Sequence, residues 1–154
     1  MLGSVEMRVR GPVLALDYGT RRIGLAVSDD EGKLAFPAGF LACHGHRRDL
    51  SALRELIEER SIRRVLVGLP VHMDGRRGQT AVAAEKFANA IAEMTGLPVE
   101  MLDERWTTRE AERALAESRS GRRRRREAVD AVAATLLLRT YLERISNAPE
   151  GELA

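Results

Sequence analysis

Residues 14–20 read LALDYGT and residues 21–29 read RRIGLAVSD. The first run is typical of an apolar strand that ends on the carboxylate of Asp17. A turn follows at Gly19, and Ile23 to Ser28 predicts a second apolar strand. Because a strand end holds a side chain rigidly, Asp17 is well placed to bind a metal ion, or a phosphate through one. The alternative is an Asx hydrogen bond that merely caps the turn.

Length and composition predict one soluble domain. The chain has 154 residues and one cysteine, Cys43, which excludes an internal disulfide, and no Cys/His cluster indicates zinc. We expect a single domain over residues 1–146 and a frayed tail over 147–154. The longest apolar run, Ala131 to Leu138, is too short to span a bilayer, and the N-terminus lacks a signal-peptide core. A reducing, cytoplasmic location without membrane attachment is therefore expected.

Arginine is unevenly distributed. The net charge is only +2, but Arg119 and Arg122 to Arg126 form a block without an acid inside it. Two further pairs, Arg21-Arg22 and Arg76-Arg77, fall in predicted loops. A general preference for arginine over lysine explains the choice of residue but not the clustering. Such clusters suit a polyanionic partner, and phosphate contacts are the simplest interpretation.

The remaining pattern alternates strands and helices without a repeat. Three successive strands with short turns predict antiparallel neighbours, and the later strand-helix-strand connections predict parallel pairs. The all-apolar run of the fourth strand indicates burial on both faces. The predicted strands are 13–17, 23–28, 33–41, 65–69 and 98–102; the predicted helices are 48–60, 79–94, one starting near 107, and 127–145.

This order predicts a five-stranded mixed sheet flanked by helices, which is the pattern of an RNase H-like α/β fold. Three positions then attract attention, because an acid adjoins apolar sequence that should be buried. Asp17 ends the first strand, Asp103-Glu104 ends the fifth, and Asp130 lies in the first turns of the final helix. Strand ends and a helix N-terminus can converge on one edge of a sheet. Carboxylates are the ligands that Mg²⁺ and Mn²⁺ prefer, and a pair of such ions can clamp both the attacking and the leaving oxygen of a phosphodiester.

Each acid has a plainer interpretation. Asp103 or Glu104 can pair with Arg105 or Arg109, which would have little energetic consequence at an exposed site. Asp130 can complement the dipole of its helix. For one member of the Asp103-Glu104 doublet we expect the plainer role.

Four blocks of sequence resemble the YqgF/RuvX family. They occur in order and at suitable spacing over nearly the whole chain, which makes the resemblance specific although no single block is decisive. The blocks are Leu16 to Gly24 with Ala26 to Asp29; Val67 to Pro70 with Met73 to Gly75; Asp103 to Arg105 with Thr107-Thr108 and Glu110-Ala111; and Val129-Asp130 with Ala133-Ala134.

The resemblance implies an RNase H-like fold related to Holliday junction resolvases, and family members are described as candidate nucleases that mature the 5′ end of pre-16S ribosomal RNA. It implies that Asp17, Glu104 and Asp130 hold Mg²⁺ or Mn²⁺ for phosphodiester hydrolysis, with Asp103 as the substitute for Glu104. Resolvase-type relatives carry a denser acidic cluster near the last helix than Asp130 provides, so one ion is expected to bind only with substrate. The arginines expected at nucleic-acid phosphates are Arg21, Arg22, Arg76, Arg105, Arg122, Arg123 and Arg124.

Other functions remain open at this point. Branched DNA is an alternative substrate to precursor rRNA, and a non-catalytic nucleic-acid-binding assembly factor is an alternative to an enzyme. The string at Asp17 to Thr20 also resembles a phosphate loop of actin-like ATPases, but those proteins need a second such domain, and no P-loop occurs here. The sequence leaves monomer and homodimer equally open.

Overall fold

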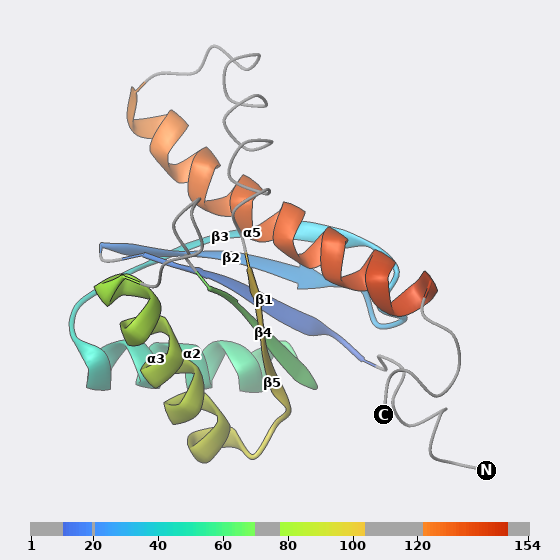
Figure 1. Ribbon diagram of the computed structural model, residues 1–154, viewed down its shortest axis with the longest axis horizontal. Helices are drawn as coiled ribbons and strands as arrows, with labels where there is room; N and C mark the ends of the chain where they lie inside the picture. The colour runs from blue at the N-terminus through green and yellow to red at the C-terminus, as the bar shows by residue number, and fades with distance from the viewer. Residues whose placement is uncertain (1–10, 20, 70–77, 104–121, 148–154) are drawn as a thin grey trace.

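The computed structural model describes residues 11–19, 21–69, 78–103 and 122–147, and for 122–130 and 147 it describes the backbone alone. Within these ranges the chain forms a central sheet with helices on both faces (Figure 1). In chain order the elements are β1 (Val13–Tyr18), β2 (Arg22–Ser28), β3 (Ala35–Ala42), α2 (His46–Glu59), β4 (Arg64–Leu69), α3 (Gln79–Thr95), β5 (Val99–Asp103) and α5 (Arg122–Asn147).

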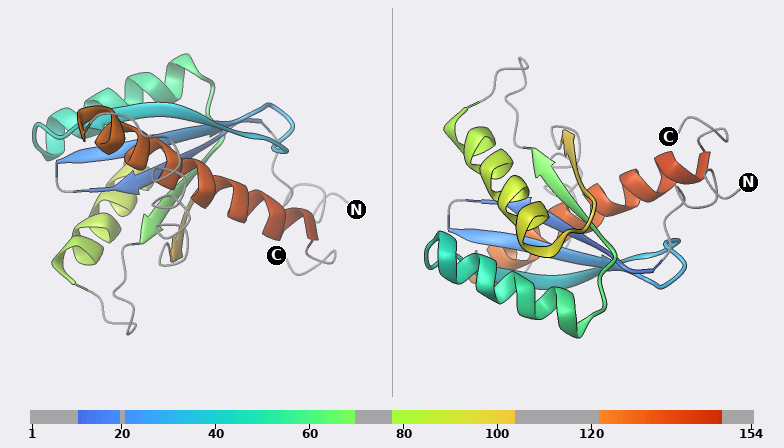
Figure 2. Two further views of the ribbon diagram at one scale, coloured as in Figure 1. Left: turned by 90° about the horizontal axis from the view of Figure 1, so that it is seen from above. Right: turned by 90° about the horizontal axis from the view of Figure 1, so that it is seen from below.

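The sheet is mixed, as predicted. Its strand order is β3-β2-β1-β4-β5. The pairs β1–β2 and β2–β3 are antiparallel, whereas β4 runs parallel to both β1 and β5. Helices α2 and α3 cover one face and α5 crosses the other (Figures 1 and 2). The central strands β1 and β4 therefore have covered faces on both sides, which explains their uninterrupted apolar sequence.

The side chains of β1 alternate between two cores. Leu14 and Leu16 pack into the core beneath α2 and α3, and Val13 and Ala15 pack into the core beneath α5. All four are fully buried. On the helix side of the second core, α5 contributes the stripe Ala134, Leu137, Leu138, Tyr141 and Leu142, which has helical spacing. The two faces of the sheet are therefore defined residue by residue.

Three elements start two or more residues away from the predicted position, each for a local reason. Helix α5 begins at Arg122 and not near Glu127, because arginine favours helix almost as strongly as leucine. Helix α2 begins at His46, two residues early, after Gly45 at φ 117°. Strand β3 begins at Ala35, because the Asp29 carboxylate accepts the amides of Lys33 and Leu34 at 2.7 and 3.0 Å and so closes the turn before it.

Other expectations concern parts of the chain beyond these ranges. The predicted helix near residue 107 and most of the tail 147–154 lie outside the described residues. Among the helices that the structure does describe, none combines the length and apolarity needed to cross a bilayer.

One polar group ties α5 to the sheet at the amino end of β4. The Arg64 guanidinium donates at 2.9 Å both to the Glu100 carboxylate and to the Tyr141 hydroxyl. The pKa of Tyr141 is raised to about 12, mainly by burial. The hydrogen bond to Glu100 also raises this pKa, and Arg64 lowers it. Three elements, β4, β5 and α5, are thereby joined by one hydrogen-bonded group.

The raised pKa of Tyr141 predicts a defined alkaline behaviour. The folded state favours the neutral phenol, so this contribution to stability is fully present below pH 10.0 and is lost as the pH rises through about 12. Tyrosinate absorbance should show one of the two tyrosines titrating near 12, and Tyr141→Phe should remove that transition together with the matching loss of unfolding free energy. Unchanged titration in Tyr141→Phe would contradict the assignment.

Candidate functional site

Asp17 lies near the carboxyl end of β1, where the buried part of the strand ends. It follows the fully buried Leu16 and is itself half-buried. Because side chains of a strand alternate, Asp17 shares its face with Val13 and Ala15, which pack beneath α5. Asp17 therefore lies on the α5 face at the carboxyl end of the central strand β1, and its side chain is partly exposed to solvent.

Glycines flank Asp17 on both neighbouring strands. In the register of the sheet, Asp17 pairs with Gly24 of β2 and with Gly68 of β4. Residues directly opposite each other point to the same face. A strip across three strands therefore carries one carboxylate between two glycines, and both glycines are buried. The carboxylate oxygens of Asp17 are ligands of the kind that a divalent cation with a phosphate ligand prefers.

Asp103 ends β5, in register with Leu69 at the end of β4. Within β5, Val99 packs into the core beneath α2 and α3, and Leu102 packs into the core beneath α5. Alternation then assigns Asp103 to the face of Val99, opposite to that of Asp17. The two acids are at the same end of the sheet but on different faces.

The remaining predicted residues are only partly covered by the structure. Glu104, Arg76 and Arg105 lie outside the described residues. Asp130 and the arginines of the 122–126 block belong to α5, for whose first turns only the backbone is described. Among the side chains that are described, no three His, Cys, Asp or Glu gather into a metal-binding group. The predicted set of Asp17, Glu104 and Asp130 remains a prediction.

Arg21 and Arg22 lie at the same end of the sheet as Asp17. Arg21 is exposed in the β1–β2 turn. Arg22 opens β2, and its guanidinium carbon lies 5.7 Å from the ring centroid of Phe40 on β3. This cation–π contact restrains the guanidinium beside the strand end.

A buried acid that the sequence analysis did not single out organises the loop next to this turn. Asp49 of α2 is only 7% exposed, and its carboxylate accepts the backbone amide of His44 at 2.8 Å. Tyr18 and Cys43 lie close by, and burial, with a smaller contribution from Asp49, raises the pKa of both. The signal available in the sequence was an acid in the first turn of an amphipathic helix, which is typical of capping.

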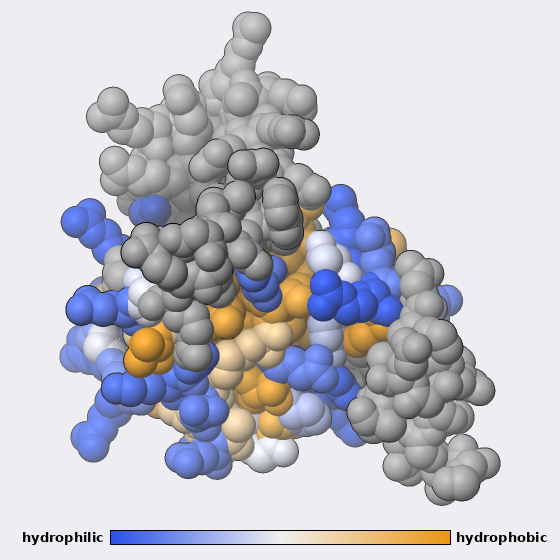
Figure 3. All heavy atoms as spheres, in the orientation of Figure 1, coloured by the Kyte–Doolittle hydropathy of each residue, from blue (hydrophilic) through white to orange (hydrophobic). Residues whose placement is uncertain are grey.

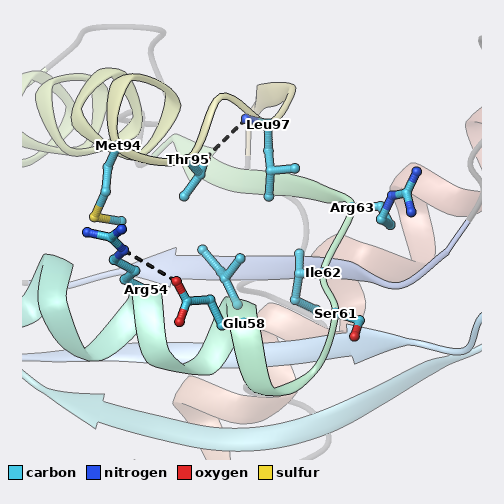
Figure 4. A pocket seen from close by; sticks show the side chains of 9 residues that line it. Arg54, Glu58, Ser61, Ile62, Arg63, Met94, Thr95 and Leu97 are labelled. Atoms are coloured by element: carbon cyan, nitrogen blue, oxygen red, sulfur yellow. Dashed lines mark hydrogen bonds and ion pairs between the residues drawn. The ribbon is translucent and has the colours of Figure 1, made fainter.

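A cavity of about 360 Å³ lies away from this site (Figure 4). It is formed where α2 and α3 end, and Arg54, Glu58, Met94 and Leu97 line it. Its neighbour Arg63 directly precedes β4, so the cavity is at the amino end of that strand, opposite to Asp17. Arg54 and Glu58 in its wall pair with each other at 3.4 Å.

Comparisons with known proteins concern the family and the fold of this chain. A protein of Koribacter versatilis named "Putative pre-16S rRNA nuclease" is 46% identical over 88% of this chain and 89% of its own length. One of Chloroflexus aggregans with the same name is 40% identical over 85% of this chain and 92% of its own. A solved structure, Thermus thermophilus RuvC in complex with a Holliday junction substrate, superposes with a TM-score of 0.59 at 16% identity and covers 90% of this chain and 98% of that one.

The RuvC likeness is one of fold, and it confirms the predicted RNase H-like architecture. The family assignment comes from sequence. The model of the family described as "RuvX: Holliday junction resolvase" matches residues 11–144, which includes every described strand and most of α5. This chain belongs to the RuvX (YqgF) family.

Proposed function

We propose that this protein is a metal-dependent endonuclease that hydrolyses phosphodiester bonds in the 5′-end processing of pre-16S ribosomal RNA. The names of its relatives supply the substrate class. The observation that carries the chemistry is the position of Asp17 between Gly24 and Gly68 on the α5 face. The family description names Holliday junctions, so branched DNA is the second substrate to test.

The geometry of α5 supports Asp130 as a partner of Asp17. Tyr141 contacts Arg64 at the amino end of β4. Position 130 precedes Tyr141 by about three helical turns, which corresponds to a rise of about 16 Å. Position 130 also continues the stripe of Ala134 and Leu137 that faces the sheet.

For the middle acid we favour Glu104 over Asp103. Asp103 alternates onto the face of α2 and α3, whereas Asp17 is on the face of α5. A ligand that shares an ion with Asp17 is better supplied by the next residue in the chain, whose side chain is also longer. Arg105 and the arginines of the 122–126 block would then contact phosphates.

The residues of this chain would divide the work simply. Asp17, Glu104 and Asp130 would hold Mg²⁺ or Mn²⁺, which would supply positive charge to the reacting phosphodiester. The phosphate would approach Asp17 beside Gly24 and Gly68, which add no side chain on its face. Arg21 and Arg22 contact the backbone of the nucleic acid and add little base specificity.

Substitution of the proposed ligands should abolish cleavage. With Mg²⁺ or Mn²⁺, Asp17→Asn, Glu104→Gln and Asp130→Asn should each lower the cleavage rate by about 100-fold or more, because each removes a carboxylate next to the reacting phosphate. The assay uses a pre-16S rRNA fragment and a four-way DNA junction. Asp30→Asn is the matched control, since Asp30 is exposed in the β2–β3 turn at the other end of the sheet. Cleavage by Asp17→Asn at the wild-type rate would sink the proposal.

Filling the glycine strip should also reduce cleavage. Gly68→Ala places a methyl group beside Asp17, so we expect a loss of at least about tenfold in rate and a smaller rise of the melting temperature on adding Mn²⁺. Val67→Ile is the control, because it adds one carbon to the same strand on the opposite face. If both variants lose activity in proportion to their loss of stability, the strip has no specific role.

A further inference from the structure

Two segments next to Asp17 contain no acidic residue. They are residues 18–28 and residues 32–48. Apart from Lys33, which precedes β3 and pairs with Glu31, their basic residues are Arg21, Arg22, Arg47 and Arg48 with His44 and His46. All of these six side chains except the half-buried Arg22 are exposed. None of Arg21, Arg47 and Arg48 forms an ion pair with a carboxylate among the described side chains. We refer to these six residues as the basic end patch.

Two contacts join the two segments of the patch. The amide of Cys43 donates to the carbonyl of Arg21 at 2.8 Å, and the Cys43 thiol lies 3.6 Å from the carbonyl of Gly19. These contacts join the β1–β2 turn to the connection between β3 and α2. The β1–β2 turn and the connection from β3 to α2 both lie at the left end of the molecule in Figures 1 and 2. Hydrophilic residues also gather at this end in the space-filling view (Figure 3).

Contacts with neighbouring residues restrain the conformation of the patch. Asp49 accepts the amide of His44 and holds the chain where it enters α2. His46 packs edge-on to Phe87, with ring centroids 6.0 Å apart. Arg22 lies over Phe40. Because these contacts restrain the backbone and some of the side chains, a ligand would bind with a smaller loss of conformational entropy.

The acid nearest the outer part of the patch, among the described residues, does not cancel the charge of Arg47 and Arg48. Asp49 is 7% exposed and its carboxylate is engaged with the backbone. Asp17 is on the α5 face, and Gly24, its partner in register, follows Arg22 by two residues. A polyanion held at Asp17 therefore has the exposed cations of the β1–β2 turn beside it, and those of α2 beyond the turn.

We infer that the basic end patch, with Arg47 and Arg48 of α2 as its outer part, binds the phosphate backbone of a nucleic-acid strand as it leaves the site at Asp17. The inference rests on the proposed function for the place of cleavage, but the binding itself does not require cleavage. The contacts are electrostatic and independent of sequence, because the patch offers mainly arginine side chains, which neutralise phosphates of any sequence.

The test compares two double variants that each remove two positive charges. Arg47→Gln/Arg48→Gln alters the patch, and Arg139→Gln/Arg144→Gln alters exposed arginines of α5 nearer its C-terminal end. The measurement is fluorescence anisotropy with a labelled four-way DNA junction and a labelled pre-16S rRNA fragment, in EDTA, over a range of salt concentrations. Thermal melting checks that both variants remain folded.

The patch variant should bind more weakly, and the slope of log affinity against log salt should become shallower by about 2, because each substituted arginine no longer neutralises a phosphate. The control variant should keep the wild-type slope. Wild-type slopes in both variants, or equal changes in both, would overturn the inference.

Cleavage assays on the same proteins separate the two proposals. If the wild type cleaves and the patch variant binds with wild-type affinity, the inference about the patch is wrong and the proposed nuclease function is supported. If the patch variant loses affinity but the wild type cleaves neither substrate, the patch is supported as a binding surface and the proposed nuclease function is wrong.

Discussion

The structure depends above all on the parallel pairing of β1 with β4. Both strands have fully buried apolar residues on both faces, so two separate cores grow from them, one beneath α2 and α3 and one beneath α5. Burying a charge inside such a strand would be costly, and Asp17 avoids this cost because it lies where the buried run ends. The same pairing that stabilises the fold therefore holds the Asp17 carboxylate at the end of a central strand, between the backbones of β2 and β4.

Much of the fold was predictable because its signals are local. The apolar run of β4, the turn after Asp17 and the Gly96 stop of α3 each reflect a short-range rule that the structure confirms. The boundaries that were predicted wrongly depend on side-chain hydrogen bonds and on the helix propensity of polar residues. Asp29 takes two amides that would otherwise extend β3, and the favourable helical propensity of arginine carries α5 back to Arg122. Neither effect is visible in an apolar pattern.

The sequence indicates individual candidate residues of the site, but it does not indicate which residues lie beside them in the folded protein. The sequence indicates Asp17 directly, because an acid follows an apolar strand. That Gly24 and Gly68 flank it depends on strand register, which no residue pattern alone determines. The same applies to the choice between Asp103 and Glu104, since alternation can be counted only once Val99 and Leu102 are assigned to faces. The role of Asp49 was missed because a buried carboxylate in the first turn of a helix looks, in sequence, like a solvated one.

The two ends of the sheet differ in how charge is used. At the amino end of β4, Arg64 is matched by Glu100 and Tyr141, so its charge is neutralised within the protein and fixes α5 in place. At the end where β1 terminates, Arg21, Arg47 and Arg48 have no carboxylate partner among the described side chains, while the one buried acid nearby, Asp49, bonds the backbone. Unmatched cations on a surface repel one another unless an anion joins them. Arg21, Arg47 and Arg48 therefore favour a polyanion at the end of the sheet that also presents Asp17.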